Sequence, residues 1–234
     1  MKRTAGFIAL LGLVLAGAAC KKKRDQVSEA SAAPAPSAPA AGAAEAPPEQ
    51  TAQEAQDAAR QQASEQQARQ ALLEYSTMED RYLGDAGAQW ASSARASSSF
   101  GDADKQPPES QAPNTPWQAT GAPNGGTWSN NHVDMGIDWL ELSYARPVAA
   151  TELRAVMTDG VGSVSKVELI DEAGAAHEVW AGVDDSKPDP RGPRTWFVRT
   201  FPRTEYKVAK VKLSLANALV HGYKEVDAVQ LVGE

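Results

Sequence analysis

The sequence contains a single cysteine, Cys20, and only three histidines among its 234 residues. One cysteine excludes an intramolecular disulfide and any metal site built from several cysteines. Aromatic residues make up 6% of the chain, and five of the six tryptophans lie at or beyond residue 117. We therefore expect one folded domain in the C-terminal part of the chain, preceded by a segment with little core-forming material.

An excess of positive charge is also missing, since 23 lysines and arginines face 30 acidic residues, for a net charge of −7. This balance excludes a nucleic-acid partner bound by overall charge. The local exception is residues 187–212, where eight lysines and arginines occur with two acidic residues. Such a patch could attract an anionic glycan, but Lys210 and Lys212 also fit the solvated face of a strand.

Patterns that indicate catalysis are scarce. The three histidines, His132, His177 and His221, are not spaced as a metal-binding pair, and no serine or cysteine stands in a nucleophile-elbow motif. Asp134 and Asp138 have the residue type of a glycosidase pair, although aspartates in loops commonly form turns. We predict a protein that is not an enzyme.

Long hydrophobic runs are absent as well. The run over residues 7–15 is too short to span a bilayer. Lys2 and Arg3 precede it and small residues follow it, which is the layout of a secretory signal. The residues Gly17-Ala18-Ala19-Cys20 resemble the lipobox of bacterial lipoproteins, with glycine where leucine is usual.

This resemblance implies that residues 1–19 are a cleaved signal peptide and that Cys20 carries the lipid anchor. It also implies the outer membrane of a bacterial envelope, because Lys21 rather than aspartate follows the cysteine. The alternative is ordinary signal cleavage, which would leave Cys20 as a free thiol.

Two further segments precede the expected domain. Residues 20–48 are rich in alanine and proline and predict a disordered linker. Residues 49–83 lack proline and glycine and consist largely of helix-forming residues, which predicts a marginal helix. Leu72, Tyr75, Met78 and Tyr82 follow helical spacing, so we expect its last turns to dock on the domain or on a partner.

Residues 84–234 predict an all-β domain. Short alternating segments recur between turn-forming residues, and the clearest is residues 210–215, where Val211, Leu213 and Leu215 share one face. The other predicted strands cover residues 139–144, 151–157, 165–170, 177–180, 195–201 and 226–232. This pattern indicates a β-sandwich or barrel.

Residues 90–233 resemble the galactose-binding-like jelly rolls, which include discoidin domains, the C-terminal domains of coagulation factors five and eight, and bacterial carbohydrate-binding modules. The segments that carry the resemblance are WASSARASSSFG at 90–101, WQATGAPN at 117–124, and residues 138–156, 163–180 and 222–233. The resemblance implies a jelly-roll β-sandwich that binds a ligand through its loops. It does not identify the ligand, because one fold supports many functions.

The same resemblance implies a structural Ca²⁺ between an early loop and the last strand. Calcium binds six to eight oxygen atoms from carboxylates, amides and carbonyls. The residues that could supply them here are Asn124, Asp134, Glu225 and Asp227. Turns and salt bridges formed by the same residues are the alternative.

Sugars bind by stacking on an aromatic ring while polar groups bond their hydroxyls. We expect Trp128 to be the exposed aromatic, because its neighbours are glycine, threonine, serine and asparagine. We expect Trp139 and Trp180, which alternate with polar positions, to be in the core or half-buried. The candidate ligand residues are Trp128, Asn130, Asn131, His132, His221 and Tyr223, with a second group of Arg191, Arg194 and Trp196.

The sequence thus predicts a lipid-anchored envelope protein whose domain recognises glycan without catalysis. The alternative is a structural or assembly protein whose sandwich binds a protein partner, aided by the stripe between Leu72 and Tyr82.

Overall fold

The computed structural model describes residues 48–101 and 112–234. The predicted signal peptide, Cys20 and residues 21–47 of the linker lie outside the described residues. Residues Pro48–Glu234 form one compact unit, which contains every helix and strand described below.

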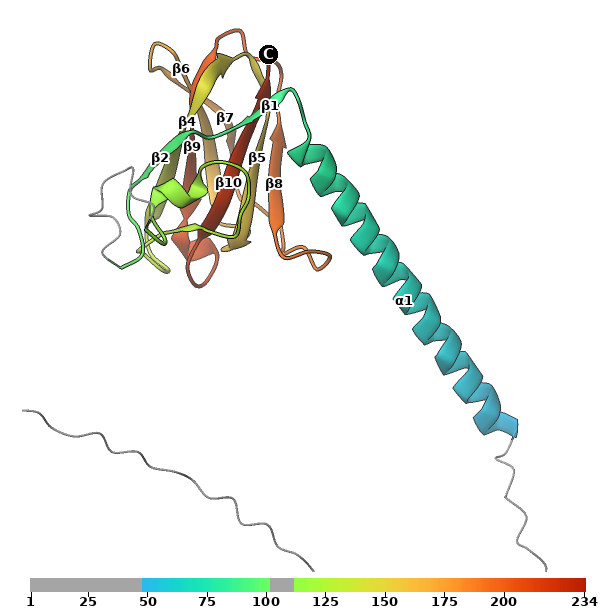
Figure 1. Cartoon of the computed structure of the whole chain (residues 1–234). Coiled ribbons are helices and arrows are strands. Elements are labelled where there is room, and N and C mark those ends of the chain that lie inside the picture. Colours follow the sequence, from blue (N-terminus) through green and yellow to red (C-terminus); the bar gives the residue numbers. More distant parts are fainter. Residues whose placement is uncertain (1–47, 102–111) are drawn as a thin grey trace, which may run out of the picture. The chain divides into compact units, whose positions relative to one another are not determined.

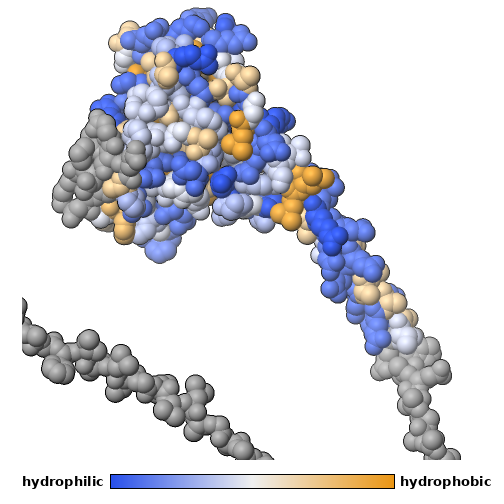
Figure 2. Space-filling model, viewed as in Figure 1, coloured by the Kyte–Doolittle hydropathy of each residue, from blue (hydrophilic) through white to orange (hydrophobic). Residues whose placement is uncertain are grey.

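Helix α1 (Pro48–Leu83) occupies the segment in which the sequence predicts a helix. It lies in a run without glycine, and it ends where the Gly84 amide donates a hydrogen bond to the Asp80 carbonyl at 3.0 Å. On the face seen in Figure 2 the helix is largely hydrophilic, with hydrophobic side chains gathered near the sandwich. Among the described residues, no helix combines the length and the apolar character needed to cross a membrane.

The remainder of the unit is a sandwich of two antiparallel sheets (Figure 1). The first sheet has the order β1-β10-β5-β8, with β3 also paired to β10, and the second has the order β2-β4-β9-β6-β7. The predicted all-β sandwich is therefore confirmed. The strands are β1 (Ala88–Trp90), β2 (Ser93–Ala96), β3 (Trp128–Ser129), β4 (Ile137–Val148), β5 (Ala150–Asp159), β6 (Val164–Asp171), β7 (Ala176–Ala181), β8 (Thr195–Thr200), β9 (Val208–Ala216) and β10 (Glu225–Gly233), and two short 3-10 helices, η2 (Pro116–Ala119) and η3 (Asn217–Leu219), lie in the connections.

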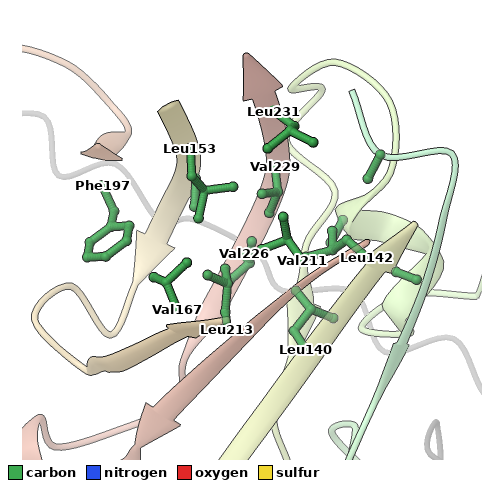
Figure 3. Packing of buried hydrophobic residues seen from close by; sticks show 14 of the residues in the cluster. Leu140, Leu142, Leu153, Val167, Phe197, Val211, Leu213, Val226, Val229 and Leu231 are labelled. Atoms are coloured by element: carbon green, nitrogen blue, oxygen red, sulfur yellow. The ribbon is translucent and has the colours of Figure 1, made fainter. Parts of the chain in front are cut away.

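The core lies between the two sheets. It is formed by inward-facing residues, which alternate with outward-facing ones along each strand (Figure 3). Leu140 of β4 pairs in register with Leu213 of β9, and Leu142 pairs with Val211. Val167 of β6 lies opposite Leu213 on the other side of β9. Because each fully buried aliphatic side chain contributes about 1.5–3 kcal/mol, this two-residue alternation determines which face of each strand turns inward.

One end of the sandwich holds the C-terminus of the chain, and the other holds several connecting loops. At one end the C-terminal Glu234 carbonyl accepts a hydrogen bond from the Ala149 amide at 2.7 Å. At the other end, Ile137 of β4 pairs with Ala216 of β9, so the connections before β4 and after β9 lie together (Figure 1). We call this second end, made by residues 97–101, 130–136 and 217–224, the loop end.

The last turns of α1 dock on the first sheet. Tyr75 is only 3% exposed, and its hydroxyl lies 3.0 Å from the Arg194 carbonyl and 2.9 Å from the Glu79 carboxylate. Burial, and then the neighbouring Glu79, raise the pKa of Tyr75 to about 12, so its hydroxyl remains a donor. The Trp196 indole N–H donates to Glu79 at 3.2 Å.

Tyr82, about two turns after Tyr75, continues the same contact. Its ring centroid lies 5.0 Å from that of Trp196, and the Arg154 guanidinium lies 4.3 Å from the Tyr82 ring. The Tyr82 carbonyl also accepts a hydrogen bond from the Gln230 amide at 2.8 Å. The expected docking of the last turns of the helix on the domain is therefore confirmed.

We predict that Tyr75→Ala releases the end of α1 from the sandwich, because truncating a buried aromatic side chain costs about 3–5 kcal/mol. Limited proteolysis of the wild-type protein should leave a resistant fragment that begins before Tyr75. In the variant the fragment should begin near Gly84, with the melting temperature of the sandwich little changed.

Leu73→Ala is the matched control, because Leu73 lies on the same helix and is 61% exposed. It should leave the fragment unchanged. A Tyr75→Ala protein that yields the wild-type fragment would show that this contact does not hold the helix.

Candidate functional site

The loop end is organised around Asn130, which is fully buried. Its side-chain nitrogen lies within hydrogen-bond distance of the His132 carbonyl, Asp138 Oδ2 and Asn217 Oδ1, at 2.6, 3.0 and 3.1 Å. Its side-chain oxygen accepts the Lys224 amide at 2.8 Å. Asn130 was expected to contact ligand; its burial corrects that expectation, because every polar atom of its side chain is already bonded within the protein.

Asp138 is the buried anion of this network. Burial alone would raise its pKa, but hydrogen bonds from neighbouring side chains outweigh burial and lower the pKa to about 2. The carboxylate is thus ionised at neutral pH. The donors are Ser97 Oγ at 2.7 Å, Ser98 Oγ at 2.8 Å, Asn217 Nδ2 at 2.9 Å and Asn130 Nδ2 at 3.0 Å.

Lys224 is the buried cation beside it, with no exposed surface. Its ammonium donates to the Val220 carbonyl at 2.7 Å, to the Gly222 carbonyl at 2.5 Å, and to the Val133 carbonyl. Burial lowers the pKa of Lys224, and nearby aspartates oppose that shift. One ammonium group therefore joins the β3–β4 connection to the β9–β10 connection.

The solvent side of the same loops carries aromatic and polar side chains. Phe100 is 42% exposed, and its ring meets the half-buried Tyr223 ring edge-on with 4.9 Å between centroids. The His221 side chain is 91% exposed and pairs with Asp134 at 2.8 Å. The exposed His132 ring lies 3.2 Å from Asp138.

Four of the expected ligand residues thus lie together on the loop end, namely Asn131, His132, His221 and Tyr223. Phe100 was missed, because it closes a run of alanines and serines that was used only for the family resemblance. The signal in the sequence was Gly101, which follows Phe100 directly; in the structure its φ of 65° marks a turn.

The prediction that Trp128 is an exposed platform is wrong. Trp128 is fully buried, and its indole N–H donates to the Ser98 carbonyl at 2.9 Å. The reason is tertiary, because β3 pairs with β10 and sets Trp128 opposite Val226, so its ring joins the core cluster. Of the neighbours that suggested exposure, Gly126 and Thr127 precede this short strand, whereas Ser129 belongs to it and Asn130 is itself buried.

The second expected group serves α1 rather than a ligand. Arg194 and Trp196 both contact Glu79 of the helix, and Arg194 Nε also lies 3.7 Å from Asp227. Arg191 pairs with Asp189 at 2.8 Å. Three arginines of the predicted basic patch are thus paired with carboxylates, because Arg199 likewise pairs with the buried Asp184 at 3.0 Å.

The four predicted calcium ligands do not converge. Within residues 48–101 and 112–234, no group of three or more histidine, cysteine or acidic residues could hold a metal ion. Asp227 accepts the amides of Asn124 and Gly125 at 3.0 and 3.1 Å, and Glu225 accepts the Thr158 hydroxyl at 3.1 Å.

Asp134 is engaged elsewhere, with His221 and the Gly222 amide. The residues present therefore do not fit the expected calcium site. Three carbonyl oxygens of the loop end do converge, and they surround the ammonium of Lys224.

We predict that Asp138→Asn destabilises the protein at neutral pH but not at pH 2. The folded-state pKa of Asp138, about 2, lies below the ordinary value of about 3.9. Its stabilisation is therefore present above pH 4 and is lost as the pH falls through 2, and it amounts to about 2 kcal/mol. Urea unfolding at several pH values measures the difference between the two proteins.

Asp185→Asn is the control, because Asp185 is exposed on the β7–β8 connection. It should change stability little at any pH. If the Asp138→Asn difference were as large at pH 2 as at pH 7, ionisation of Asp138 would not be its cause.

No family model matches this chain, and no curated protein matches it significantly. Solved structures that are similar to it include the family 32 carbohydrate-binding module from C. perfringens NanJ in complex with galactose, with 14% identity, a TM-score of 0.44, and coverage of 62% of this chain and 98% of that one. A second is the module CBM32-3 from a family 31 glycoside hydrolase of Clostridium perfringens, with 10% identity, a TM-score of 0.47, and coverage of 65% and 98%. A third is chitosan-binding module 1 from a chitosanase/glucanase of Paenibacillus sp. IK-5, with 12% identity, a TM-score of 0.43, and coverage of 60% and 93%.

Proposed function

We propose that this protein binds saccharides through the loop end of its sandwich and performs no catalysis. The observation that carries the proposal is the exposed Phe100 ring, set against Tyr223 and flanked by solvent-exposed polar side chains. An exposed aromatic ring beside hydrogen-bonding groups is the combination that a sugar requires, because a pyranose has an apolar face and a rim of hydroxyls.

The polar side chains of the loop end suit the neutral hydroxyls of a sugar better than a strongly charged ligand. Asn131 offers an exposed amide, which both donates and accepts. His132 and His221 offer imidazole nitrogens, and each ring lies beside a carboxylate, Asp138 or Asp134. The acidic partners balance any positive charge on the histidines, so the surface presents hydrogen bonds rather than net charge.

The network beneath this surface favours recognition because it fixes the loops in advance. Lys224 joins the two connections, and Asn130 and Asp138 bond to both of them and to the Ser97–Ser98 segment that leads to Phe100. Loops that are ordered before binding lose less conformational entropy when the ligand arrives. Exposed side chains on such a base hold a fixed spacing.

The carboxylates of the loop end are poor candidates for glycoside hydrolysis. A general acid for that reaction needs a raised pKa. Asp138 instead has a lowered pKa and is enclosed by donors. Asp134 is held by an ion pair with His221 and by the Gly222 amide.

The proposal includes attachment to the envelope through Cys20, in keeping with the signal-like residues before it. A helix of the length of α1 extends about 54 Å at 1.5 Å per residue, which suits a spacer between a lipid anchor and a binding domain. Several acyl chains give stable anchoring where one chain would be marginal.

A second candidate, an assembly protein that binds another protein, has one observation in its favour. Leu72, Leu73 and Leu83 are exposed on α1. Exposed hydrophobic residues that cluster mark interaction sites more often than isolated ones do. This candidate would move ahead if the loop end bound no saccharide.

We predict that Phe100→Ala weakens saccharide binding at least tenfold, the equivalent of about 1.4 kcal/mol, because it removes the stacking surface. Its melting temperature should change little, since Phe100 is exposed. Tyr223→Ala should weaken binding by removing the ring that supports Phe100. Titration with glycans selected from an array of neutral oligosaccharides measures both effects.

Met135→Ala is the matched control, because Met135 is an exposed apolar residue of the same loop end and is not aromatic. It should bind as the wild type does. Lys224→Met should lower both the melting temperature and the affinity, since it frees the loops. Full binding by Phe100→Ala and Tyr223→Ala together would contradict the proposed site.

For the anchor, we predict that Cys20→Ser abolishes incorporation of radiolabelled fatty acid and moves the protein out of the membrane fraction, because the serine hydroxyl cannot form the thioether. Lys21→Gln, beside it, should leave labelling intact. A Cys20→Ser protein that stays in the membrane fraction would show that another feature attaches it.

A further inference from the structure

A recess lies on the outer face of the second sheet, at a distance from the loop end. It is a cavity of about 200 Å³. Ser143 stands six residues along β4 from Ile137 at the loop end, which is about 20 Å in a strand. Its polar and aromatic lining consists of Ser93, Arg95, Trp117, Glu141, Ser143 and Lys210.

The strand register explains why these residues face one recess. Ser93 of β2 lies opposite Ser143 of β4, which lies opposite Lys210 of β9. Arg95 likewise lies opposite Glu141. Residues two apart on a strand share a face, so both rows project outward from the core. The half-buried Trp117 of η2 forms the wall of the recess.

The recess holds one carboxylate between two cations. Glu141, with a side chain only 7% exposed, accepts Arg95 Nε and Nη2 at 2.8 and 2.9 Å, and Lys210 Nζ lies 3.3 Å away. Burial would raise the pKa of Glu141, but Arg95 and then Lys210 outweigh it and lower the pKa. The carboxylate therefore stays ionised, and the three groups together carry a net charge of +1.

A further cation stands beside the recess. Lys212 Nζ lies 5.0 Å from the Trp139 ring centroid, and the Arg95 guanidinium lies 5.6 Å from the same ring. In the described part of the chain, Lys212 has no carboxylate within ion-pair distance. The local charge is thus positive in a protein whose net charge is −7.

Several donors of the recess remain available to a ligand. Arg95 bonds to Glu141 through Nε and Nη2. Its third nitrogen, Nη1, has no partner among the residues that the structure describes. The side-chain hydroxyls of Ser93 and Ser143 are likewise unbonded within the described residues. An arginine edge and an ammonium bind carboxylates well, and hydroxyls bond those of a sugar.

We propose that this recess binds one hexuronate unit, the carboxylate-bearing form of a sugar, as a site separate from the loop end. The carboxylate bonds to Arg95 Nη1 and Lys210, and the ring lies against Trp117 above the two serines. The recess is smaller than the 300–1,000 Å³ of pockets for drug-sized ligands, which suits a single ring. An inorganic anion would use the cations but would gain nothing from the tryptophan.

The test is calorimetric titration of the purified full-length protein with an oligomeric hexuronate and with its methyl ester, which keeps the rings and removes the charge. The acid should bind, and the ester should bind at least tenfold more weakly. Trp117→Phe and Arg95→Gln should each lower the affinity for the acid tenfold or more. Ser143→Ala should lower it several-fold without a change in melting temperature, which separates contact from folding.

Two controls make the result specific. Lys207→Gln removes the same charge from an exposed lysine outside the recess and should bind as the wild type does. Phe100→Ala, which disables the loop end, should also leave hexuronate binding unchanged, so failure of one site is distinguishable from failure of the other. Equal binding of acid and ester, an equal loss in Lys207→Gln, or full competition by sulfate at the same concentration would each overturn the proposal.

Discussion

The buried ammonium group of Lys224 holds the loop end of this sandwich together. Burying a charged group away from water costs free energy unless the group is hydrogen-bonded. Here the ammonium of Lys224 donates hydrogen bonds to the carbonyls of Val133, Val220 and Gly222. Those carbonyls belong to two connections that are 87 residues apart in the chain (133 to 220). A divalent cation with its oxygen ligands could join two loops in the same way. In this protein a side chain supplies the positive charge, and the acidic residues expected to bind calcium are bonded elsewhere.

Helix α1 is likewise held on the sandwich by a few side chains. Its sequence is that of a marginal helix, and helices in folded proteins gain most of their stability from tertiary packing of one face. Here that face is three residues long, Tyr75, Glu79 and Tyr82, at helical spacing. Its consequences reach the sandwich, because Arg194 and Trp196, which resemble a ligand group in the sequence, are occupied by the helix. The contacts that hold the end of α1 are therefore the same contacts that occupy Arg194 and Trp196 in place of a ligand.

Sequence patterns identified the strands well and the site less well, for a physical reason. Val211, Leu213 and Leu215 are all fully buried, as their alternation predicted, because facing direction in a strand follows from a period of two residues. Burial of Trp128 depends instead on its pairing with Val226, 98 residues later (128 to 226), which no local pattern encodes. Asn130 and Asp138 were found as polar loop residues, but only the fold reveals that they bond each other rather than a ligand. Asn131, His132, His221 and Tyr223 were expected in loops, and they do lie in the connections of the loop end. Their role toward a ligand stays a prediction.

The two proposed surfaces each contain an aromatic residue, Phe100 at the loop end and Trp117 in the recess. The groups around each ring differ, and so should the ligands. Phe100 stands among neutral hydrogen-bonding groups whose histidines are matched by carboxylates, whereas Trp117 stands among cations that exceed the single carboxylate of Glu141. The acidic protein as a whole repels anions at long range, but charges in solution are screened within about 8 Å at physiological ionic strength. A local excess of cations at Arg95, Lys210 and Lys212 can therefore attract an anionic sugar despite the net charge of −7. Because screening leaves hydrogen bonds and ring stacking largely intact, the two surfaces should differ in their response to salt, and that difference follows from which side chains the sheet register brings together.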